Sequence, residues 1–430
     1  MGIVVLGAGV TGLAAGRASG GVVYEAADSP GGICSSYYLA PGQTERRPAG
    51  DREDAYRFEI GGGHWIFGGD PAILSLIDRL GPARRYQRRS SVYFPDDKLS
   101  VPYPLQNHLR HLGPEIAARA LAEMVAGGGS AVTMQEWLEK NFGRSLCELF
   151  FGPFHALYTD GLYTRIAPQD GYKSPVDMQA VMAGAFGAPP AAGYNVTFVY
   201  PADGLDRLAH GLAAGCRVEY GRRAGRVDPR RREVTFTDGS SVRYDRLIST
   251  LPLNRALEIA GIEVGEPDPH TSVLVLNIGA VRGGTCPDDH WVYVPGSRAG
   301  FHRVGFYSNV DSSFLPAPKR ASDPRVSLYV ERAYALGTRP PEAEIARYAG
   351  EVIAELQDWG FIAEAEVLDP TWIDVAYTWS WPGSRWRADG IRALEAKGIN
   401  QVGRYGRWSF QGIADSIRDG LYVGAALAAG

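Results

Sequence analysis

The sequence predicts an α/β protein in which a Rossmann-type dinucleotide-binding domain is combined with a mainly helical insertion and a domain built on an antiparallel sheet. Three observations predict this class. The chain opens with an apolar segment, Ile3–Leu6, and a glycine-rich turn. Helical periodicity dominates from about residue 104 to residue 190, and alternating apolar and polar segments follow from Ser272. A chain of 430 residues exceeds one ordinary core, so we expect more than one domain.

The glycine-rich turn has the spacing G-x-G-x-x-G, with Gly7, Gly9 and Gly12 at its glycine positions. The first glycine permits a tight turn, the second lets the backbone approach a pyrophosphate, and the third lets the next helix pack on the strand. Thr11 opens that helix, whose N-terminal amides are expected to face the phosphates. A second strand ends at Glu25, whose carboxylate can accept both ribose hydroxyls of an adenosine.

Two further glycine groups follow. Gly31 and Gly32 keep the backbone slim where a dinucleotide passes. With the preceding strands and turn, they resemble the FAD-binding fingerprint of glutathione-reductase-like flavoproteins. Three consecutive glycines, among them Gly62 and Gly63, then precede His64. Such a run is costly in entropy unless its backbone lies against a flat body, and a flavin ring is such a body. We therefore expect His64 beside the flavin.

Composition restricts the class of partner and the compartment. A formal charge of −4 gives no reason to expect nucleic acid. The four cysteines have no CxxC spacing, so neither a metal site nor a disulfide framework is expected, and a reducing cytoplasm fits. The first strand begins at Ile3, which leaves no room for a leader peptide, and no apolar run is long enough for a bilayer. We expect a cytoplasmic protein with no membrane partner, and the sequence leaves a homo-oligomer open.

Strand, turn and helix patterns recur in the middle and at the end of the chain, so we expect a discontinuous FAD-binding domain. Its first part is residues 1–92, its second part with a β-meander is 194–270, and its C-terminal part is 386–430. The mainly helical insertion, with a mobile loop, takes residues 93–193. The antiparallel-sheet substrate domain takes residues 271–385.

The C-terminal part contains a short strand, a glycine turn with Arg404, and a helix for which Asp415 and Ser416 are the expected cap. The glycine spacing is again typical of FAD enzymes. A helix N-terminus stabilises negative charge. We therefore expect this helix to face the flavin pyrimidine and to favour the reduced form.

Several blocks in a common order along nearly the whole chain resemble UDP-galactopyranose mutases, and the eukaryotic type more than the common bacterial type. The blocks are Gly62–Phe67, Val101–Asn107, Thr164–Ala167, Tyr194–Pro201, Phe301–Asn309 and Gly403–Trp408. The resemblance implies that Arg303 and Arg165 bind the substrate pyrophosphate. It also implies that the His64 loop holds the flavin and that Asn195 orients the sugar.

The same resemblance implies a substrate site with Tyr103, Leu105, Gln106 and Asn107 at the nucleobase, to which Tyr307, Trp381 and Phe410 are added. Two departures matter. Trp381 and Phe410 stand where the family has tyrosines on the pyrophosphate, and neither side chain can donate the phenolic hydrogen bond in the same place. The nucleobase and the sugar, UDP-galactose or a related NDP-hexose, are therefore left open.

The activity that the resemblance implies is an isomerisation of an NDP-sugar between its pyranose and furanose forms, with no net redox change. Reduced FAD attacks the anomeric carbon through N5, a flavin–sugar adduct forms, and the nucleoside diphosphate leaves and returns. NAD(P)H or another reductant only primes the enzyme. The alternative is an FAD-dependent amine-oxidase-like or protoporphyrinogen-oxidase-like oxidoreductase, which does not explain the two arginines. A non-catalytic flavin-binding protein is a third reading.

The sequence also predicts how Arg303 is presented. It lies in an alternating segment, where side chains two apart share a face of the sheet. Gly305 is therefore expected to leave the space beside Arg303 open to a bulky anion, while His302 and Val304 point the other way. The alternative for Arg303, as for Arg165, is a structural ion pair.

Overall fold

The computed structural model describes residues 2–48, 53–169, 176–187, 196–320, 324–335 and 337–429. Its first layer is a five-stranded parallel sheet. The strands, in spatial order, are β10 (Arg217–Glu219), β2 (Val22–Tyr24), β1 (Ile3–Leu6), β14 (Arg246–Ser249) and β20 (Ile399–Gln401). Val4 and Val5 of the central strand are 3% and 0% exposed, as expected for a strand covered on both faces. This sheet confirms the Rossmann-type class and gathers strands from both ends and the middle of the chain.

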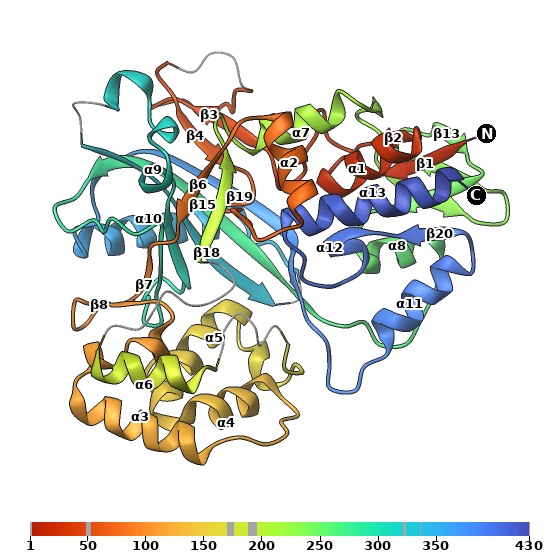
Figure 1. The fold of residues 1–430 in the computed structure, drawn as a ribbon. Coiled ribbons are helices and arrows are strands. Elements are labelled where there is room, and N and C mark those ends of the chain that lie inside the picture. Colours follow the sequence, from red (N-terminus) through yellow and green to blue (C-terminus); the bar gives the residue numbers. More distant parts are fainter. Residues whose placement is uncertain are drawn as a thin grey trace.

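Helices α1 (Val10–Ser19) and α13 (Ile413–Ala429) pack side by side on this sheet (Figure 1). Two glycines of α13 allow the close approach. A Cβ at Gly420 would lie 2.2 Å from the carbonyl oxygen of Thr11, and one at Gly424 would lie 2.5 Å from that of Ala15. The first and last helices of the chain are thereby joined in one layer.

The second layer is a seven-stranded, mainly antiparallel sheet. Its strands, in spatial order, are β19 (Ile362–Thr378), β15 (His270–Arg282), β18 (Arg325–Ala335), β17 (Arg303–Phe306), β16 (Trp291–Tyr293), β7 (Ser90–Phe94) and β8 (Leu99–Pro102). Helix α10 (Glu342–Asp358) covers one face, where Val304 is buried among apolar side chains. The expected hairpin β7–β8 forms, but β7 also pairs in parallel with β16. Residue 92, the first boundary expected from the sequence, thus lies inside a strand of this sheet.

A helical layer lies beneath the sheet (Figure 1). It contains α3 (Pro114–Ala126), α4 (Met134–Leu146), a π-helical turn (Cys147–Phe151), α5 (Gly152–Thr159) and α6 (Met178–Phe186). Gly143 adopts a φ of 75° and kinks α4. Helices α3 and α4 therefore form where the periodicity predicts them, whereas α6 extends into residues that were expected in the mobile loop, and α5 contacts β18.

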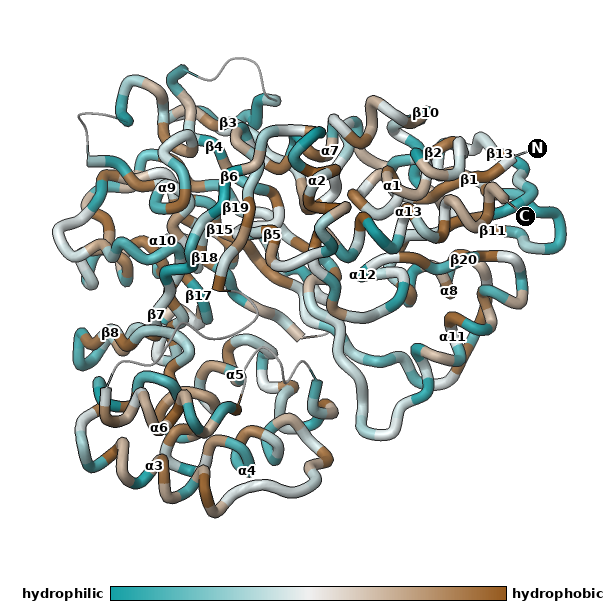
Figure 2. Tube along the Cα trace, viewed as in Figure 1, coloured by the Kyte–Doolittle hydropathy of each residue, from teal (hydrophilic) through white to brown (hydrophobic). Residues whose placement is uncertain are grey.

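Smaller elements complete the fold. They are β3 (Ser36–Leu39), β4 (Tyr56–Glu59), β5 (Ile66–Phe67), β6 (Ala83–Gln87), β9 (Thr197–Pro201), the meander β11 (Ala224–Asp228), β12 (Glu233–Phe236) and β13 (Ser241–Arg243), and helices α2 (Pro71–Leu80), α7 (Leu205–Ala213), α8 (Leu253–Ala260), α9 (Tyr307–Val310), α11 (Trp386–Glu395) and α12 (Gly403–Gly406). Figure 2 shows hydrophobic residues on the central strands and hydrophilic residues in the outer loops. Within the described ranges, no helix has the length and apolar character needed to cross a membrane.

Candidate active site

One cavity of about 780 Å³ connects the parallel sheet with the antiparallel sheet and the helical layer. It begins at the carboxyl ends of β1 and β2, where ligands bind in open α/β sheets. Its lining includes Gly7, Gly9, Thr11, Glu25, Gly31, Gly32, Cys34, Gly63, His64, Tyr103, Arg303, Glu331, Arg404, Phe410, Asp415 and Ser416. Most of the residues that the sequence assigns to a cofactor therefore share one space.

The glycine turn forms the first end of the cavity. Gly7 has a φ of 96° and makes the tight turn. Gly9 faces open space, since nothing lies within 4 Å of an added Cβ. Gly12 does not line the cavity, because its Cβ would lie 1.8 Å from the Gly7 carbonyl oxygen. Gly7 and Gly12 thus meet the steric requirements expected of the motif, and Gly9 leaves open space, so its contact with a pyrophosphate stays a prediction.

Glu25 is fixed against this turn. One carboxylate oxygen accepts a hydrogen bond from the Ala8 amide at 2.6 Å, and the other accepts one from the Ala27 amide at 2.9 Å. Gly31 and Gly32, with φ angles of 111° and 58°, lie against Gly9 of the same turn. The carboxylate is therefore held at the rim where the ribose of an adenosine would lie.

Three arginines at this end were not expected from the sequence. Arg222, Arg223 and Arg255 line the cavity from the start of the meander and from α8. Arg222 is held by Asp238 and by the Ser240 hydroxyl, which accepts a hydrogen bond at 2.9 Å. No local motif marks these positions, because the meander reaches the glycine turn only in the folded chain.

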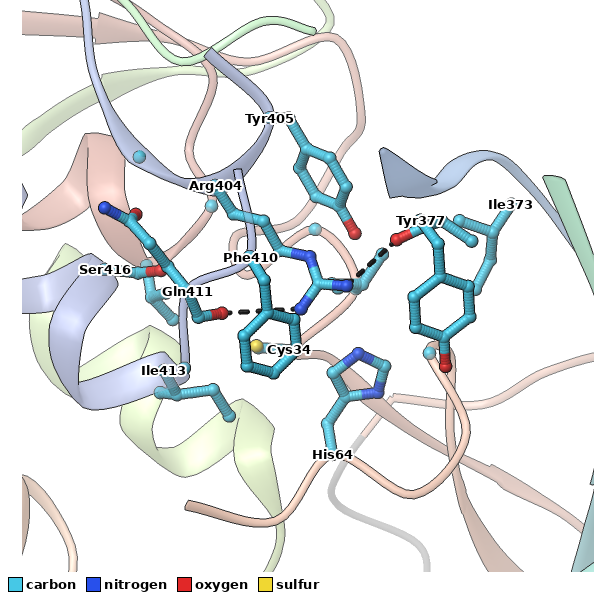
Figure 3. A pocket seen from close by; sticks show the side chains of 18 of the residues that line it. Cys34, His64, Ile373, Tyr377, Arg404, Tyr405, Phe410, Gln411, Ile413 and Ser416 are labelled. Atoms are coloured by element: carbon cyan, nitrogen blue, oxygen red, sulfur yellow. Dashed lines mark hydrogen bonds between the residues drawn. The ribbon is translucent and has the colours of Figure 1, made fainter. Parts of the chain in front are cut away.

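Arg404 and Phe410 lie together in the middle of the cavity (Figure 3). The Arg404 guanidinium donates to the carbonyl oxygens of Ala376 at 3.0 Å and of Gln411 at 3.4 Å. Its central carbon lies 4.7 Å from the centre of the Phe410 ring. Two backbone carbonyls and one ring thus fix the arginine, and no carboxylate of the described residues forms an ion pair with it.

Helix α13 points its N-terminal end at the same region, and Ile413, Asp415 and Ser416 line the cavity. The helix begins at Ile413, so Asp415 and Ser416 lie in its first turn and are not its cap, contrary to the expectation. The Ser416 amide donates to the Gly412 carbonyl oxygen at 2.9 Å. The helix start nevertheless faces the cavity, as expected.

His64 projects into the cavity opposite Arg404 and Phe410 (Figure 3). Its Nδ1 atom is buried and has no hydrogen-bond partner among the described residues. Burial, followed by the nearby charge of Arg404, lowers the pKa of His64 to about 4. The side chain is therefore neutral at pH 7 and has an unused ring nitrogen.

The glycines before His64 leave room for two protein side chains, Tyr329 and Glu331. A Cβ at Gly63 would lie 1.9 Å from the Tyr329 hydroxyl, and one at Gly62 would lie 3.0 Å from Oε1 of Glu331. Gly62 does not line the cavity. The ring of Tyr329, a protein side chain, therefore lies against one side of this loop, while Gly61 and Gly63 also line the cavity, so a flavin beside the loop stays a prediction.

Arg303 and Glu331 form an ion pair at the far end of the cavity. They lie directly opposite each other on β17 and β18. Nη2 of Arg303 lies 2.5 Å from Oε1 and 2.6 Å from Oε2 of Glu331. Burial opposes ionisation of Glu331, but the charge of Arg303 and the close contacts of Arg303 and His302 together lower the pKa of Glu331 to about 2. Both groups are therefore charged at pH 7.

The surroundings of Arg303 correct two expectations. A Cβ at Gly305 would lie 1.9 Å from Cζ of Tyr329, so this ring fills the space that was expected to be open. His302 precedes β17 and does not follow the strand alternation. It lines the cavity with Arg303, and its Nε2 lies 3.5 Å from Oε2 of Glu331.

Aromatic side chains enclose this end. They are Tyr103, Phe150, Phe151, Phe154, His155, Tyr158, Tyr293 and Tyr377. The Tyr103 and Tyr293 rings are 4.7 Å apart between centres, and those of Tyr158 and Tyr377 are 4.8 Å apart. The aromatic residues of α5 were not predicted to line a site, because aromatic residues at helical spacing are equally typical of a core. Only Tyr103 was predicted.

Four other predicted substrate residues lie outside the cavity lining. Leu105, Gln106 and Asn107 are at most 2% exposed and lie under α6, where a Cβ at Gly184 would be 1.7 Å from the Asn107 carbonyl oxygen. Tyr307 is 0% exposed, and its hydroxyl donates to Oδ1 of Asn277 at 3.0 Å. These side chains support the fold around the site and do not face its space.

Arg165 and Trp381 also lie outside the lining. Arg165 is exposed, and its guanidinium carbon lies 5.0 Å from the centre of the Trp381 ring. The indole nitrogen of Trp381 donates to the Pro267 carbonyl oxygen at 3.1 Å. The structure thus brings Arg165 to an aromatic ring and not to Arg303. Asn195 lies outside the described residues.

The lining fits a flavin dinucleotide. It combines an open glycine cradle, a fixed carboxylate, a helix N-terminus and the unpartnered Nδ1 of His64. Its charged members are five arginines and three carboxylates, namely Arg222, Arg223, Arg255, Arg303, Arg404, Glu25, Glu331 and Asp415. This excess of positive charge suits an anionic ligand. Within the part of the chain that the structure describes, no group of three or more His, Cys, Asp or Glu side chains could hold a metal ion.

Solved structures share this fold. Reduced UDP-galactopyranose mutase matches with a TM-score of 0.83 and 20% identity, covering 100% of this chain and 95% of its own. A putative protoporphyrinogen oxidase from an Exiguobacterium species matches at 0.68 and 12%, covering 99% and 98%. Putrescine oxidase bound to putrescine matches at 0.57 and 17%, covering 100% and 99%. At these identities the likeness establishes the fold.

The sequence itself matches a family over more than half of its length. The model of the family described as flavin-containing amine oxidoreductase matches residues 21–270. This range contains Glu25, the Gly31–Gly32 pair and the His64 loop. The chain belongs to the flavin-containing amine oxidoreductase family, and its cofactor is FAD.

Proposed function

We propose that this FAD-dependent enzyme is an isomerase that interconverts the pyranose and furanose forms of an NDP-sugar, either UDP-galactose or a related NDP-hexose. One observation carries the proposal. The cavity extends beyond the flavin cradle to a charged arginine, Arg303, enclosed by aromatic side chains. A diphosphate between a sugar and a planar base needs a cation and an aromatic wall of this kind. The likeness in fold to a UDP-galactopyranose mutase supports the same substrate class.

Arg303 is suited to bind a phosphate because Glu331 holds only one of its nitrogens. Nη2 donates to both carboxylate oxygens, while Nε is buried and has no hydrogen-bond partner among the described residues. A guanidinium presents several donors in one plane and can bind phosphate through two of them. We propose Arg303 as the main pyrophosphate contact, with Arg165 and Asn195 as further contacts that the family resemblance suggests.

The chemistry needs stabilisation of negative charge on the leaving diphosphate. A fixed cation stabilises that charge more as it develops, so Arg303 lowers the barrier and not only the binding energy. Reduced FAD, when bound, supplies a nucleophilic nitrogen for the anomeric carbon. The start of α13 favours negative charge on the bound cofactor, and neutral His64 offers a ring nitrogen without adding charge. Tyr103 and Phe154 offer ring faces for the nucleobase.

The reaction uses a reductant only once, so NAD(P)H or another cytoplasmic donor would prime the enzyme. The free cysteines are Cys34, Cys147, Cys216 and Cys286, and we propose a reducing, cytoplasmic compartment for the protein. These side chains form no disulfide on which the fold depends.

The second candidate is an amine-oxidase-like or protoporphyrinogen-oxidase-like oxidoreductase, which the family match favours. The charges near the substrate end argue against an amine. Glu331 is the carboxylate of this end, and Arg303 already occupies both of its oxygens. A protonated amine would therefore meet a cation without a free counter-ion.

A panel of nucleotide sugars separates the two candidates. The purified protein is reduced with dithionite under nitrogen, mixed with each nucleotide sugar, and the products are separated by HPLC. We expect an isomer of equal mass from at least one of them. Steady hydrogen peroxide production from an amine or a porphyrinogen in air, with no isomer from any nucleotide sugar, would instead establish the oxidoreductase.

A further inference from the structure

His302 is a buried polar residue at the substrate end of the cavity. It is 1% exposed and lines the cavity immediately before β17 begins. Its backbone is fixed, because its amide donates to the Glu331 carbonyl oxygen and its carbonyl oxygen accepts from the Val294 amide, both at 3.0 Å. Its ring lies 6.0 Å from Phe154 and 5.2 Å from Tyr158 between ring centres. The imidazole is therefore held in a defined place.

Nδ1 of His302 has no hydrogen-bond partner among the described residues, and Nε2 has only a long contact with Glu331. Nε2 is 3.5 Å from Oε2 of Glu331, an oxygen that already accepts from Arg303 at 2.6 Å. Burial lowers the pKa of His302, so the ring is neutral at pH 7, with one donor and one acceptor. Buried polar groups without partners destabilise a fold and call for an explanation. A bound ligand supplies one.

We infer that His302 is a substrate-binding residue whose ring hydrogen-bonds a sugar hydroxyl beside the diphosphate on Arg303. This inference rests on the proposed function and names a further contact in the same site. His302 and Arg303 are consecutive, approach the same carboxylate and line the same cavity. The cation suits the phosphate, while the neutral imidazole suits the uncharged hydroxyl next to it. Together they recognise a glycosyl phosphate and not a phosphate alone.

The test compares two probes, UDP and UDP-galactose, on the reduced FAD-bound protein. His302→Phe keeps an aromatic ring but removes both nitrogens. We expect it to weaken UDP-galactose binding roughly ten- to a hundredfold and to leave UDP binding unchanged. His302→Gln, which keeps a donor and an acceptor, should recover part of the loss. Arg303→Lys is the matched control, and it should weaken both probes.

The outcomes are distinct. A His302→Phe protein that retains FAD and binds both probes as the wild type does would overturn the inference and leave the proposed function standing. If that variant does not fold, His302→Leu is judged by the same criterion. Equal weakening of UDP and UDP-galactose would also overturn it, because the contact would then not be to the sugar. A wild-type protein that binds neither probe and converts no nucleotide sugar would refute the proposed function and the inference with it.

Discussion

At the scale of single residues, the Arg303–Glu331 ion pair supplies the charges at the end of the cavity where we propose that the substrate binds. Removing one partner of a buried pair leaves an uncompensated charge, which typically costs about 3–5 kcal/mol of stability. The pair is thus a structural ion pair and, in our proposal, also the cationic contact for the substrate. The two roles predict different results for single and double variants.

We expect Arg303→Ala to lower kcat/KM for the nucleotide sugar by roughly 30- to several-thousandfold, because a desolvated charge partner of the diphosphate is lost. The variant should also unfold at lower urea, since Glu331 is left unpaired. FAD content should stay normal in the folded protein.

The matched control is the double variant Arg303→Met, Glu331→Gln. It removes both charges, so we expect it to regain much of the lost stability but none of the lost activity. Wild-type kcat/KM in Arg303→Ala, for a verified substrate, would show that the residue serves the fold alone.

The burial of His64 predicts a pH dependence of stability. The pKa of His64 is lowered from 6.5 to about 4, so the unfolded chain binds a proton more readily between these values. Stability from this residue is present above pH 6.5 and is lost as the pH falls toward 4. At pH 5 the loss is about 2 kcal/mol. Urea unfolding of the wild type and of His64→Gln at pH 7 and pH 5 measures it. Parallel losses in both proteins would contradict the assignment.

At the scale of elements, the glycine turn contains one glycine that we expect to be needed only for cofactor binding and another that packing requires. Gly9 has ordinary extended angles, φ −67° and ψ 170°, and open space at its Cβ position. Gly9→Val should therefore fold with near-normal stability but lose FAD, because the side chain takes the place of the phosphates. The flavin absorbance per protein and the thermal unfolding of the apoprotein measure the two effects.

Gly12→Val is the control, since its side chain would meet the Gly7 carbonyl oxygen at 1.8 Å. We expect this variant to lose stability as well as cofactor. A Gly9→Val protein that purifies with full FAD would contradict the position of the phosphates.

The α1–α13 contact predicts a second pair of variants. Gly420→Ala places a methyl group 2.2 Å from the Thr11 carbonyl oxygen, and overpacking of this kind costs about 1–3 kcal/mol. Gly350→Ala in α10 is the control, because nothing lies within 4 Å of its Cβ. It should stabilise the protein by about 0.5–1 kcal/mol, as alanine does in an exposed helix. Equal stability of the two variants would contradict the close packing of the helices.

The sequence predicts those parts of the site that a short segment encodes by itself. The turn from Gly7 to Gly12 and the strand ending at Glu25 are local, and their geometry is as expected. Arg303 was located correctly in a strand that lines the cavity, but its partner Glu331 follows only from the register of β17 against β18. Tyr307 was expected in the substrate site, yet the strand ends at Phe306 and α9 begins, so its side chain turns into the core.

Long-range contacts account for the other differences. The pattern of residues 90–102 predicts a hairpin, and nothing in it predicts that β7 pairs with β16, whose first residue Trp291 lies opposite Ser90. Likewise, the aromatics of α5 and the arginines of the meander reach the cavity only through tertiary packing. The opposite difference occurs in a motif that resembles a family ligand contact but is covered by α6 in the folded chain. Its residues are Leu105, Gln106 and Asn107.

At the scale of the whole molecule, the cavity lies where three layers meet. The parallel sheet supplies the nucleotide cradle, the antiparallel sheet supplies the Arg303–Glu331 pair, and the helical layer supplies the aromatic wall. Helix α13, near the end of the chain, packs against α1, the first helix of the chain (Figure 1). In our proposal, cofactor and substrate therefore share this one cavity, as a reaction between them requires.

The number of turnovers per reduction tests this account most directly. The FAD-bound protein is reduced once with dithionite under nitrogen, the excess reductant is removed, and the nucleotide sugar identified by the panel is added. The account predicts many molecules of isomer per FAD, a flavin spectrum that stays reduced, and loss of activity when air is admitted. Product that never exceeds one molecule per FAD, or turnover by the fully oxidised protein, would contradict an isomerase in which reduced FAD acts without being consumed.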